Sequence, residues 1–184
     1  MIFVTVGTQL PFDRLIGAVD AWAGAGSTVP VFAQIGPSRL RPSNIEYAQF
    51  ISPSECAERM EEASAIVAHA GMGTILTALE LGKPLLVLPR RAMLGEHRNE
   101  HQLATAHRFS ELGKLQVAFD ETELPSALDD LNRAVAQPRL GAYAPETFLR
   151  SLRAFITGER LSQGFGPAPA DDDAAFSTAA PVVF

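Results

Sequence analysis

The sequence predicts an α/β fold in which a parallel sheet is flanked by helices. Apolar runs of strand length alternate along the chain with segments whose apolar residues recur at helical spacing. The clearest unit comprises a strand at 65–68, a turn with two glycines at 69–73, a helix at 74–81 and a strand at 85–88. Parallel strands need a crossover of this kind, so the unit is the basis of the predicted sheet.

Turn and capping residues delimit the remaining elements in order. Pro11 suits the first turn of a helix, and the segment Gly24-Ala25-Gly26 ends that helix. Ser54 is expected to cap the second helix, Gly82 ends the helix of the central unit, and Gly113 ends the helix after it. We therefore expect strands at 2–6, 29–35, 46–51 and 115–119, and helices at 11–23, 55–63, 99–112, 121–135 and 145–156.

Composition limits the class of protein. The chain has 184 residues, of which 47% are hydrophobic, and this suffices for one domain with a substantial core. The net charge of −6 argues against nonspecific binding of nucleic acid, because no basic excess is present to neutralise phosphates. The single cysteine, Cys56, excludes an internal disulfide, and we interpret it as a structural thiol in a reducing compartment.

The sequence also predicts how the chain is divided. No apolar run approaches the roughly 18 residues that span a bilayer, and the apolar segment 1–7 reads as a buried strand because it has no basic start or cleavage site. From about Gly158 the composition shifts to turn formers, acidic residues and small residues. We expect a single domain at 1–157 and a flexible tail at 158–184. The helix at 145–156 is apolar enough to pack across the sheet or to contact a partner.

The turn of the central unit predicts a phosphate site. Gly71 and Gly73 can adopt backbone angles that other residues avoid, and they leave room for a ligand to approach the main chain. The free N–H groups at the start of the next helix favour an anion, and Thr74 adds a hydroxyl. Glu80 follows two turns later, where a carboxylate can accept hydrogen bonds from ribose hydroxyls. Gly7-Thr8 forms a second strand-to-helix turn that can meet a phosphate or sugar. The alternative for both is a tight turn without a ligand.

A polar segment at 90–102 follows a buried strand. Ligands of open parallel sheets bind outside the carboxyl ends of the strands, so the loops after several strands are expected to converge there. His97 and His101 lie four residues apart, but no further Cys or Asp cluster accompanies them. We therefore expect no metal and no cofactor, and we interpret the segment as a hydrogen-bonding surface for a polyhydroxyl ligand.

Several motifs, in their order and spacing, resemble the glycosyltransferase family 28 carboxy-terminal domain. They are Met1-Ile-Phe-Val-Thr-Val-Gly-Thr8, His69-Ala-Gly-Met-Gly-Thr74, Glu80-Leu-Gly-Lys-Pro84 and Glu100-His-Gln102. The resemblance covers residues 1–157 and is greatest to short, single-domain members that act in dolichol-linked glycan and bacterial exopolysaccharide synthesis. It implies a Rossmann-like parallel sheet flanked by helices, which forms one half of a GT-B glycosyltransferase.

The resemblance also implies roles for particular residues. The segment 70–74 resembles the diphosphate site, Glu80 resembles the ribose-binding glutamate, and the backbone at 50–51 corresponds to the strand end that pairs with uracil. His101 and Gln102 match the pair that contacts sugar hydroxyls, whereas the general base lies in the acceptor half. The substrate-binding residues expected here are Gly7, Thr8, Phe50, Ile51, His69, Ala70, Gly71, Met72, Gly73, Thr74, Glu80, Glu100, His101 and Gln102.

The function implied by the resemblance is inverting transfer of a sugar from a UDP-sugar to a polyprenyl-linked saccharide. This chain would be the donor-binding subunit, active with a membrane-anchored partner that binds the acceptor, and it would lie in the cytoplasm at the inner face of the membrane. One alternative is a noncatalytic module that binds UDP-sugar or stabilises the partner; a stand-alone epimerase would need acid–base residues that are not evident. The transferred sugar stays open, although a carboxylated sugar would suit Arg90, Arg91 or Arg98.

Overall fold

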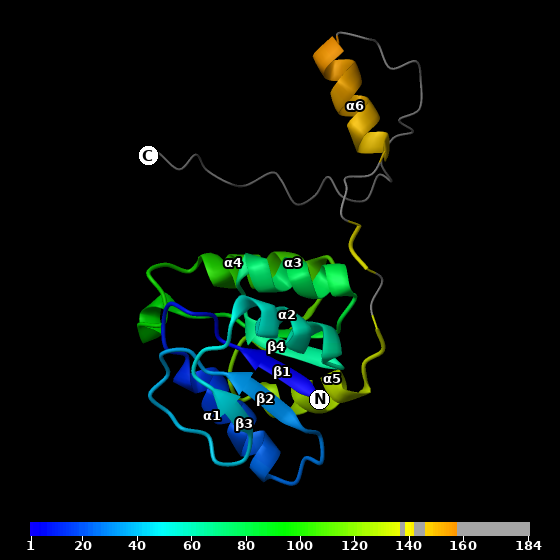
Figure 1. Cartoon of the computed structure of the whole chain (residues 1–184). Coiled ribbons are helices and arrows are strands. Elements are labelled where there is room, and N and C mark those ends of the chain that lie inside the picture. Colours follow the sequence, from blue (N-terminus) through cyan, green and yellow to red (C-terminus); the bar gives the residue numbers. More distant parts are fainter. Residues whose placement is uncertain (137–138, 142–145, 158–184) are drawn as a thin grey trace. The chain divides into compact units, whose positions relative to one another are not determined.

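The fold is a parallel sheet of six strands covered by helices on both faces, as the sequence predicts (Figure 1). The computed structural model of the protein describes residues 1–136, 139–141 and 146–157. The strand order is β3-β2-β1-β4-β5-β6, and every neighbouring pair is parallel. The chain thus begins in the middle of the sheet, builds outward to β3, and returns to the other side of β1 at β4. This is the doubly wound, Rossmann-like order.

The elements lie close to the expected positions, and most are shorter by a few residues. The strands are β1 Ile2–Thr5, β2 Val31–Gln34, β3 Glu46–Ala48, β4 Ala65–His69, β5 Leu85–Leu88 and β6 Gln116–Val117. The helices are α1 Asp13–Gly24, α2 Pro53–Glu62, α3 Met72–Leu81, α4 His101–Glu111, α5 Leu124–Arg133 and α6 Glu146–Thr157, with a 3-10 helix, η1, at Ala92–Leu94.

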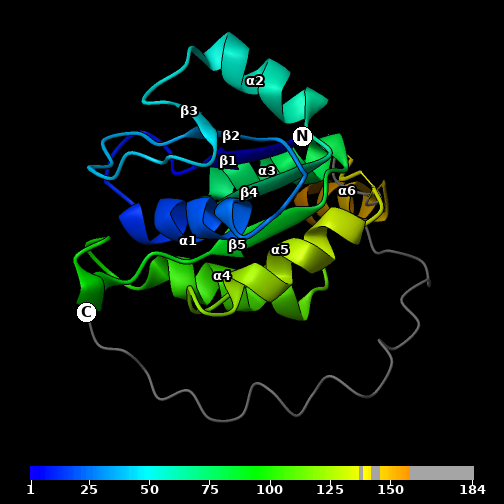
Figure 2. The same cartoon turned by 90° about the horizontal axis from the view of Figure 1, so that it is seen from below.

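Two apolar layers hold the sheet between the helices (Figures 1 and 2). Successive side chains of a strand point to opposite faces, and in β1 Val4 joins the layer under α1 and α5 while Phe3 joins the layer under α2, α3 and α4. Because both faces are covered, the central strands are mostly apolar, and all of their residues except His69 at the end of β4 are buried. This two-layer core fixes β1 and β4 side by side, with Val4 opposite Val67.

Two helices, α2 and α3, begin two residues earlier than expected. Helix α2 begins at Pro53, and its cap is Ser52, whose hydroxyl accepts a hydrogen bond from the N–H of Glu55 at 3.1 Å. The expectation that Ser54 caps this helix is wrong, because Pro53 takes the first helical position and requires the cap to precede it. Helix α3 begins at Met72 rather than Thr74, so Gly73 belongs to the first helical turn.

The chain divides into two units, Met1–Ala142 and Tyr143–Phe184, and α6 belongs to the second. Its side chains Phe155 and Ile156 are exposed. The expected flexible tail at 158–184 lies outside the described residues, and the domain boundary after residue 157 stays a prediction. Among the described helices, none combines the length and the apolar character that crossing a membrane requires.

Candidate functional site

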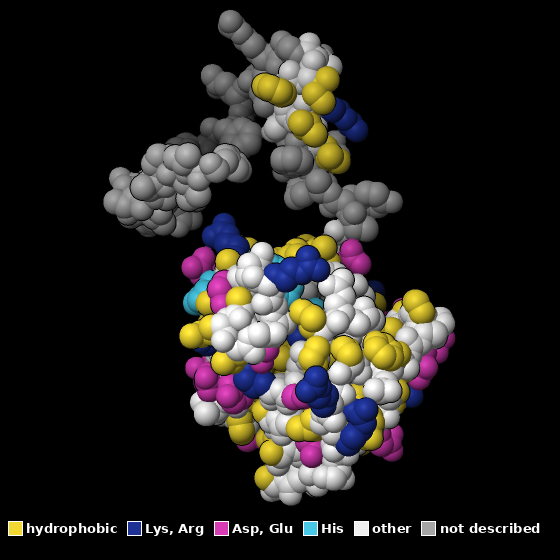
Figure 3. All heavy atoms as spheres, turned by 90° about the vertical axis from the view of Figure 1, so that its left-hand side faces the viewer, with side chains coloured by type: hydrophobic (Ala, Val, Ile, Leu, Met, Phe, Trp, Pro, Cys, Tyr) yellow, Lys and Arg dark blue, Asp and Glu magenta, His cyan; other side chains and the backbone are white. Residues whose placement is uncertain are grey.

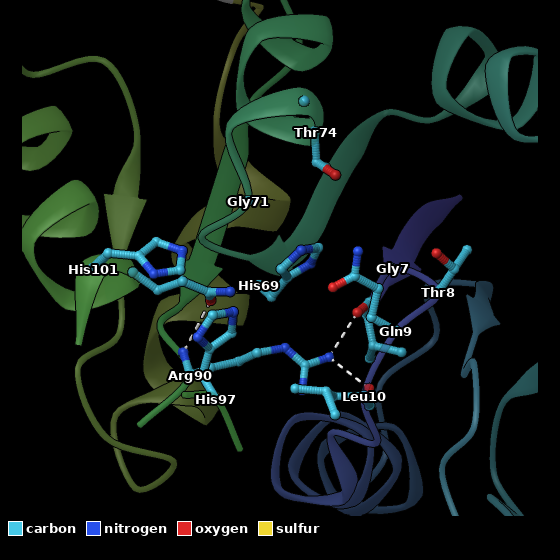
Figure 4. A pocket seen from close by; sticks show the side chains of 13 residues that line it. Gly7, Thr8, Gln9, Leu10, His69, Gly71, Thr74, Arg90, His97 and His101 are labelled. Atoms are coloured by element: carbon cyan, nitrogen blue, oxygen red, sulfur yellow. Dashed lines mark hydrogen bonds between the residues drawn. The ribbon is translucent and has the colours of Figure 1, made fainter. Parts of the chain in front are cut away.

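A cavity of about 330 Å³ opens at the carboxyl ends of β1 and β4 (Figure 4). The helices that follow these two strands cover opposite faces of the sheet, and this is where open α/β sheets bind ligands. Three segments converge on it: the loop after β1, the start of α3 after β4, and the segment that joins β5 to α4. The lining residues are Val6, Gly7, Thr8, Gln9, Leu10, His69, Gly71, Gly73, Thr74, Arg90, His97, His101 and Gln102.

The start of α3 supplies unpaired backbone donors to this cavity. Gly71 is the residue before the helix, and its carbonyl accepts from the N–H of Ile75, while the first three helical N–H groups have no acceptor within the helix. A β-carbon placed on Gly73 would meet no heavy atom within 4 Å, so this glycine leaves open space beside the donors. Free N–H groups with the positive end of the helix dipole behind them are suited to a phosphate.

His69 lies between the two glycine segments. A β-carbon on Gly7 would lie 3.0 Å from Cε1 of the imidazole, and one on Gly71 would lie 2.4 Å from Nε2. The pKa of His69 is lowered to about 4, chiefly by burial and also by the positive charge of Arg90, while the backbone of Thr5 opposes the shift. The imidazole is therefore neutral at pH 7. It packs between the two loops and carries no positive charge there.

Arg90 fixes the loop after β1. Its side chain is 3% exposed, and its guanidinium lies 4.5 Å from the centre of the Phe12 ring. Burial lowers its pKa to about 10, so it remains protonated at pH 7. Its two terminal nitrogens donate to the main chain, and these hydrogen bonds hold the backbone of the loop in place. The acceptors are the carbonyls of Val6 at 2.7 Å, Leu10 at 2.8 Å, Pro11 at 2.6 Å and Glu96 at 3.3 Å.

The β5–α4 segment contributes amide and imidazole groups. Gln102 is buried, and its side-chain oxygen accepts from the N–H of Arg90 at 3.1 Å. The rings of His97 and His101 meet edge to face with centroids 4.4 Å apart, and Nδ1 of His101 shares a hydrogen bond with the side-chain oxygen of Asn99. Both histidines line the cavity together with Gln102. The segment therefore presents groups that can bond to hydroxyl or oxyanion ligands.

The cavity carries no acidic side chain among its lining residues. Its ionisable groups are Arg90, which is cationic, and three imidazoles, although the chain as a whole has a net charge of −6. Histidine side chains reach the surface near Lys and Arg side chains on the face drawn in Figure 3. No cluster of three or more His, Cys, Asp or Glu side chains arranged to hold a metal occurs within the described part of the chain. The arrangement suits an anion, and no lining carboxylate can act as a general base.

Comparison with known proteins assigns the chain to a family. The family model described as the glycosyltransferase family 28 C-terminal domain matches residues 1–146. The chain belongs to this family. The expected membership of this family is confirmed, and so is the expected half of a GT-B fold.

The relatives and solved structures agree with this family. The UDP-N-acetylglucosamine transferase subunit ALG13 of Eremothecium gossypii is 39% identical over 82 residues, covering 44% of this chain and 38% of that protein. Human ALG13 is 31% identical over 124 residues, covering 62% of this chain but 10% of that protein. The chain thus matches well under half the length of these curated relatives.

The solved structures support the fold. An NMR structure of ALG13 has a TM-score of 0.54 at 21% identity and covers 83% of this chain and 94% of that one. The crystal structure of the kitacinnamycin glycosyltransferase has a TM-score of 0.55 at 21% identity and covers 72% of this chain and 35% of that one.

Within this family 28 domain, the cavity brings together part of the predicted site. The predicted residues that line it are Gly7, Thr8, His69, Gly71, Gly73, Thr74, His101 and Gln102. Those that do not are Phe50, Ile51, Ala70, Met72, Glu80 and Glu100. The expected special backbone angles at Gly71 and Gly73 are wrong: φ at Gly71 is −89°, and Gly73 is helical. Gly71 is required because a side chain there would meet His69, and Gly7 is the one with a positive φ, +73°.

Glu100 stabilises the local backbone of the β5–α4 segment. Its carboxylate accepts from the N–H groups of Ala92 at 2.9 Å and Met93 at 3.3 Å, so it holds the 3-10 turn η1. Glu80 is exposed on the face of α3 that carries Gly73 and Thr77, at about 10 Å further along the helix by its rise per residue. The backbone of 50–51, beyond the end of β3, makes no hydrogen bond with another described residue.

The predicted substrate-binding residues did not include Val6, Gln9, Leu10, Arg90 and His97, which line the cavity. Arg90 and His97 belong to the polar segment 90–102, which was expected to form a ligand surface because it follows the carboxyl end of a buried strand. The bonds from Arg90 to residues 6, 10 and 11 join parts of the chain about 80 positions apart, and no local pattern reports them.

Proposed function

We propose that this chain binds the nucleotide-sugar donor of a glycosyltransferase, with the diphosphate of a UDP-sugar at the start of α3. The observation that carries the proposal is the cavity between β1 and β4, where unpaired helix N–H groups meet open space at Gly73. The relatives in the comparisons are subunits of a UDP-N-acetylglucosamine transferase, which supports a UDP-sugar as the ligand.

The reaction we propose is inverting transfer to a saccharide acceptor. An acceptor hydroxyl attacks the anomeric carbon, the bond from that carbon to the diphosphate oxygen breaks, and the UDP that leaves gains negative charge. The helix N-terminus at Met72 to Thr74 is already oriented to stabilise that charge. His101 and Gln102 are then placed to bond the sugar hydroxyls.

The base that deprotonates the acceptor comes from a partner chain in this proposal. The support is chemical, since the described lining of the cavity holds no carboxylate and His69 has a pKa of about 4 that makes it a weak base. His101 is assigned to the sugar hydroxyls in this proposal, and the partner supplies the base. We propose a membrane-anchored partner that binds a polyprenyl-linked acceptor, as in glycan or exopolysaccharide synthesis, and that holds this chain at the inner face of the membrane.

Calorimetric titration of the full chain with UDP and a panel of UDP-sugars tests donor binding. Glu80→Ala should weaken UDP binding if the ribose reaches Glu80, and Thr77→Ala should do so if the ribose lies one turn nearer the phosphate. The exposed residue Glu62 on α2 provides a charge-matched control, Glu62→Ala. Failure of both α3 variants to change UDP affinity would remove the ribose from this face of the helix. Absence of UDP binding, alone and with the partner, would refute the proposal.

Transfer assays separate a catalytic subunit from a noncatalytic module. With the partner present, Gly73→Ala should abolish sugar transfer if this chain holds the donor. Full transfer by the complex containing this variant, together with stable association of the two chains, would instead assign this chain a stabilising role.

A further inference from the structure

A second cavity, of about 610 Å³, adjoins the first between the loop after β1 and the β5–α4 segment. It is lined by Gln9, Leu10, His97, Arg98 and Asn99. Gln9, Leu10 and His97 also line the first cavity, so the two cavities share part of their walls. A group bound in the second cavity would therefore lie next to the transferred sugar or next to the acceptor.

We propose that this second cavity is an oxyanion subsite, in which Arg98, His97 and Asn99 bind a carboxylate or phosphate group of the sugar or of the acceptor. The proposal rests on the proposed function, because the sugar and the acceptor are those of the glycosyl transfer. The ligand chemistry is common to the two sources, and the experiment below distinguishes them.

The first observation that supports the oxyanion subsite is that Arg98 is free to bind a ligand. The side chain is exposed, and it makes no hydrogen bond or ion pair with any other described residue. The two other arginines of the segment already have partners. The terminal nitrogens of Arg90 donate to backbone carbonyls, and Arg91 donates to the carbonyl of Phe119 at 2.6 Å. Of these three arginines, which are the candidates for binding a carboxylated sugar, Arg98 is the one whose charge is available to a ligand.

The nearby carboxylates do not neutralise Arg98. Glu96 bonds to Arg14 at 2.9 Å and to the N–H of Arg91 at 2.9 Å, and its side chain is 12% exposed. Glu100 accepts from the N–H groups that begin η1. The acidic groups of the segment are thus engaged by Arg14 and by backbone N–H groups, whereas Arg98 lines the second cavity without such a partner among the described residues.

The second observation concerns the imidazole of His97. Its Nδ1 is buried and has no hydrogen-bond partner among the described residues. Desolvation lowers the pKa of His97, and the positive charges of His101, Arg90 and Arg98 lower it further. These charges therefore disfavour a protonated His97, while a hydrogen bond with Asn99 opposes the shift. An oxyanion bound among them would relieve the repulsion and would accept hydrogen bonds from a protonated His97 and from Arg98.

Asn99 completes the donor set. Its side-chain oxygen accepts from the N–H of His101 at 3.4 Å and also meets the ring of His101, so the amide is oriented with its oxygen toward α4. The NH₂ group has no partner among the described residues and is left to a ligand. A guanidinium, an imidazole and an amide NH₂ on one short segment are donors that match a carboxylate or phosphate.

The test compares Arg98→Gln with the wild-type full chain by calorimetric titration. UDP-glucose and UDP-glucuronate differ in the group at C6, a hydroxymethyl against a carboxylate, and they probe the sugar as the source. Farnesyl diphosphate, titrated in the presence of UDP, probes the acceptor phosphate. Arg133→Gln on α5 removes a charge whose partner is Asp130, at 3.7 Å, and it serves as the control for net charge.

The expected result is that Arg98→Gln weakens binding of one anionic probe about tenfold and leaves UDP and UDP-glucose unchanged. A loss confined to UDP-glucuronate assigns the subsite to a sugar carboxylate, and a loss confined to farnesyl diphosphate assigns it to an acceptor phosphate. The inference is overturned if neither anionic probe binds, if neither responds to the substitution, or if Arg133→Gln has the same effect. UDP binding by the wild-type chain reports separately on the proposed function.

Discussion

The imidazole of His69 occupies the space that a side chain at Gly71 would need, since a β-carbon there would lie 2.4 Å from Nε2. Gly7 has the same relationship to the other side of the ring, at 3.0 Å from Cε1. His69 ends β4, and the two glycines belong to the loops that line the cavity. The ring therefore sets the separation of the β1 and β4 loops, and through it the position of the α3 N–H groups.

Gly71→Ala should destabilise the protein by about 1–3 kcal/mol, because the methyl group must displace a buried ring in a packed site. UDP affinity should fall as well. Urea unfolding measures the first effect. The double variant His69→Ala/Gly71→Ala is the control: removal of the ring should make the methyl group nearly neutral, and additive losses would show that the two residues do not compete for the same space.

Gly73→Ala should have the opposite effect on stability. No atom lies within 4 Å of the new methyl group, and alanine is a better helix former than glycine, so the protein should gain up to about 1 kcal/mol. UDP affinity should nevertheless fall at least about tenfold, because the methyl group occupies the approach to the helix N–H groups. Thermal unfolding and calorimetric titration separate the two quantities. Unchanged UDP affinity would place the phosphates away from Gly73.

The neutral state of His69 predicts a stability that depends on pH. The folded-state pKa of about 4 is below the ordinary value of 6.5, so only the unfolded chain takes up a proton between these values. The free energy of unfolding is therefore full above pH 6.5 and falls, by up to about 3 kcal/mol, as the pH drops toward 4. Unfolding curves at pH 7 and 5 should show this slope for the wild type, and His69→Gln should flatten it.

Arg90→Met should cost about 3 kcal/mol or more, because it leaves several loop carbonyls without their buried donor. UDP affinity should fall with it, since the loop from 7 to 11 loses its anchor. Arg90→Lys should lie between, because one ammonium cannot reach all of these acceptors. Urea unfolding gives the free energies. A loss below about 1 kcal/mol for the methionine variant would mean that the loop is held by other contacts.

The fold was predictable because its signals are local. Buried strands such as β4 and β5 are continuous apolar runs, and Gly82, at φ +67°, ends α3 as its position suggests. Strand ends were overestimated where apolar residues continue past the hydrogen-bonded ladder, as at Phe50, which is 53% exposed. The 3-10 turn η1 was not predicted, because its apolar residues do not recur at a regular spacing. Its backbone is held by a hydrogen bond to the carboxylate of Glu100, eight residues further along the chain.

The site was predictable only in part, because its geometry is set by contacts between loops. The glycine-containing turn after β4 predicted an anion site and does line the cavity, but the reason for Gly71 is the ring of His69 and not a special backbone angle. Arg90 looked like a candidate ligand for a carboxylated sugar, yet its donors are directed at the main chain. Such a distinction requires coordinates, since an arginine in sequence does not report its partners.

The most direct test of the central claim is an NMR titration of the full chain, labelled with ¹⁵N, against UDP. The largest amide shifts are expected at Met72, Gly73 and Thr74, which carry the three free N–H groups at the start of α3, with a second group at Gly7 and Thr8, which line the cavity. The same titration of Gly73→Ala should give small shifts at equal UDP concentration. Largest shifts elsewhere in the wild type, with residues 72–74 unmoved, would contradict the claim that α3 binds the diphosphate.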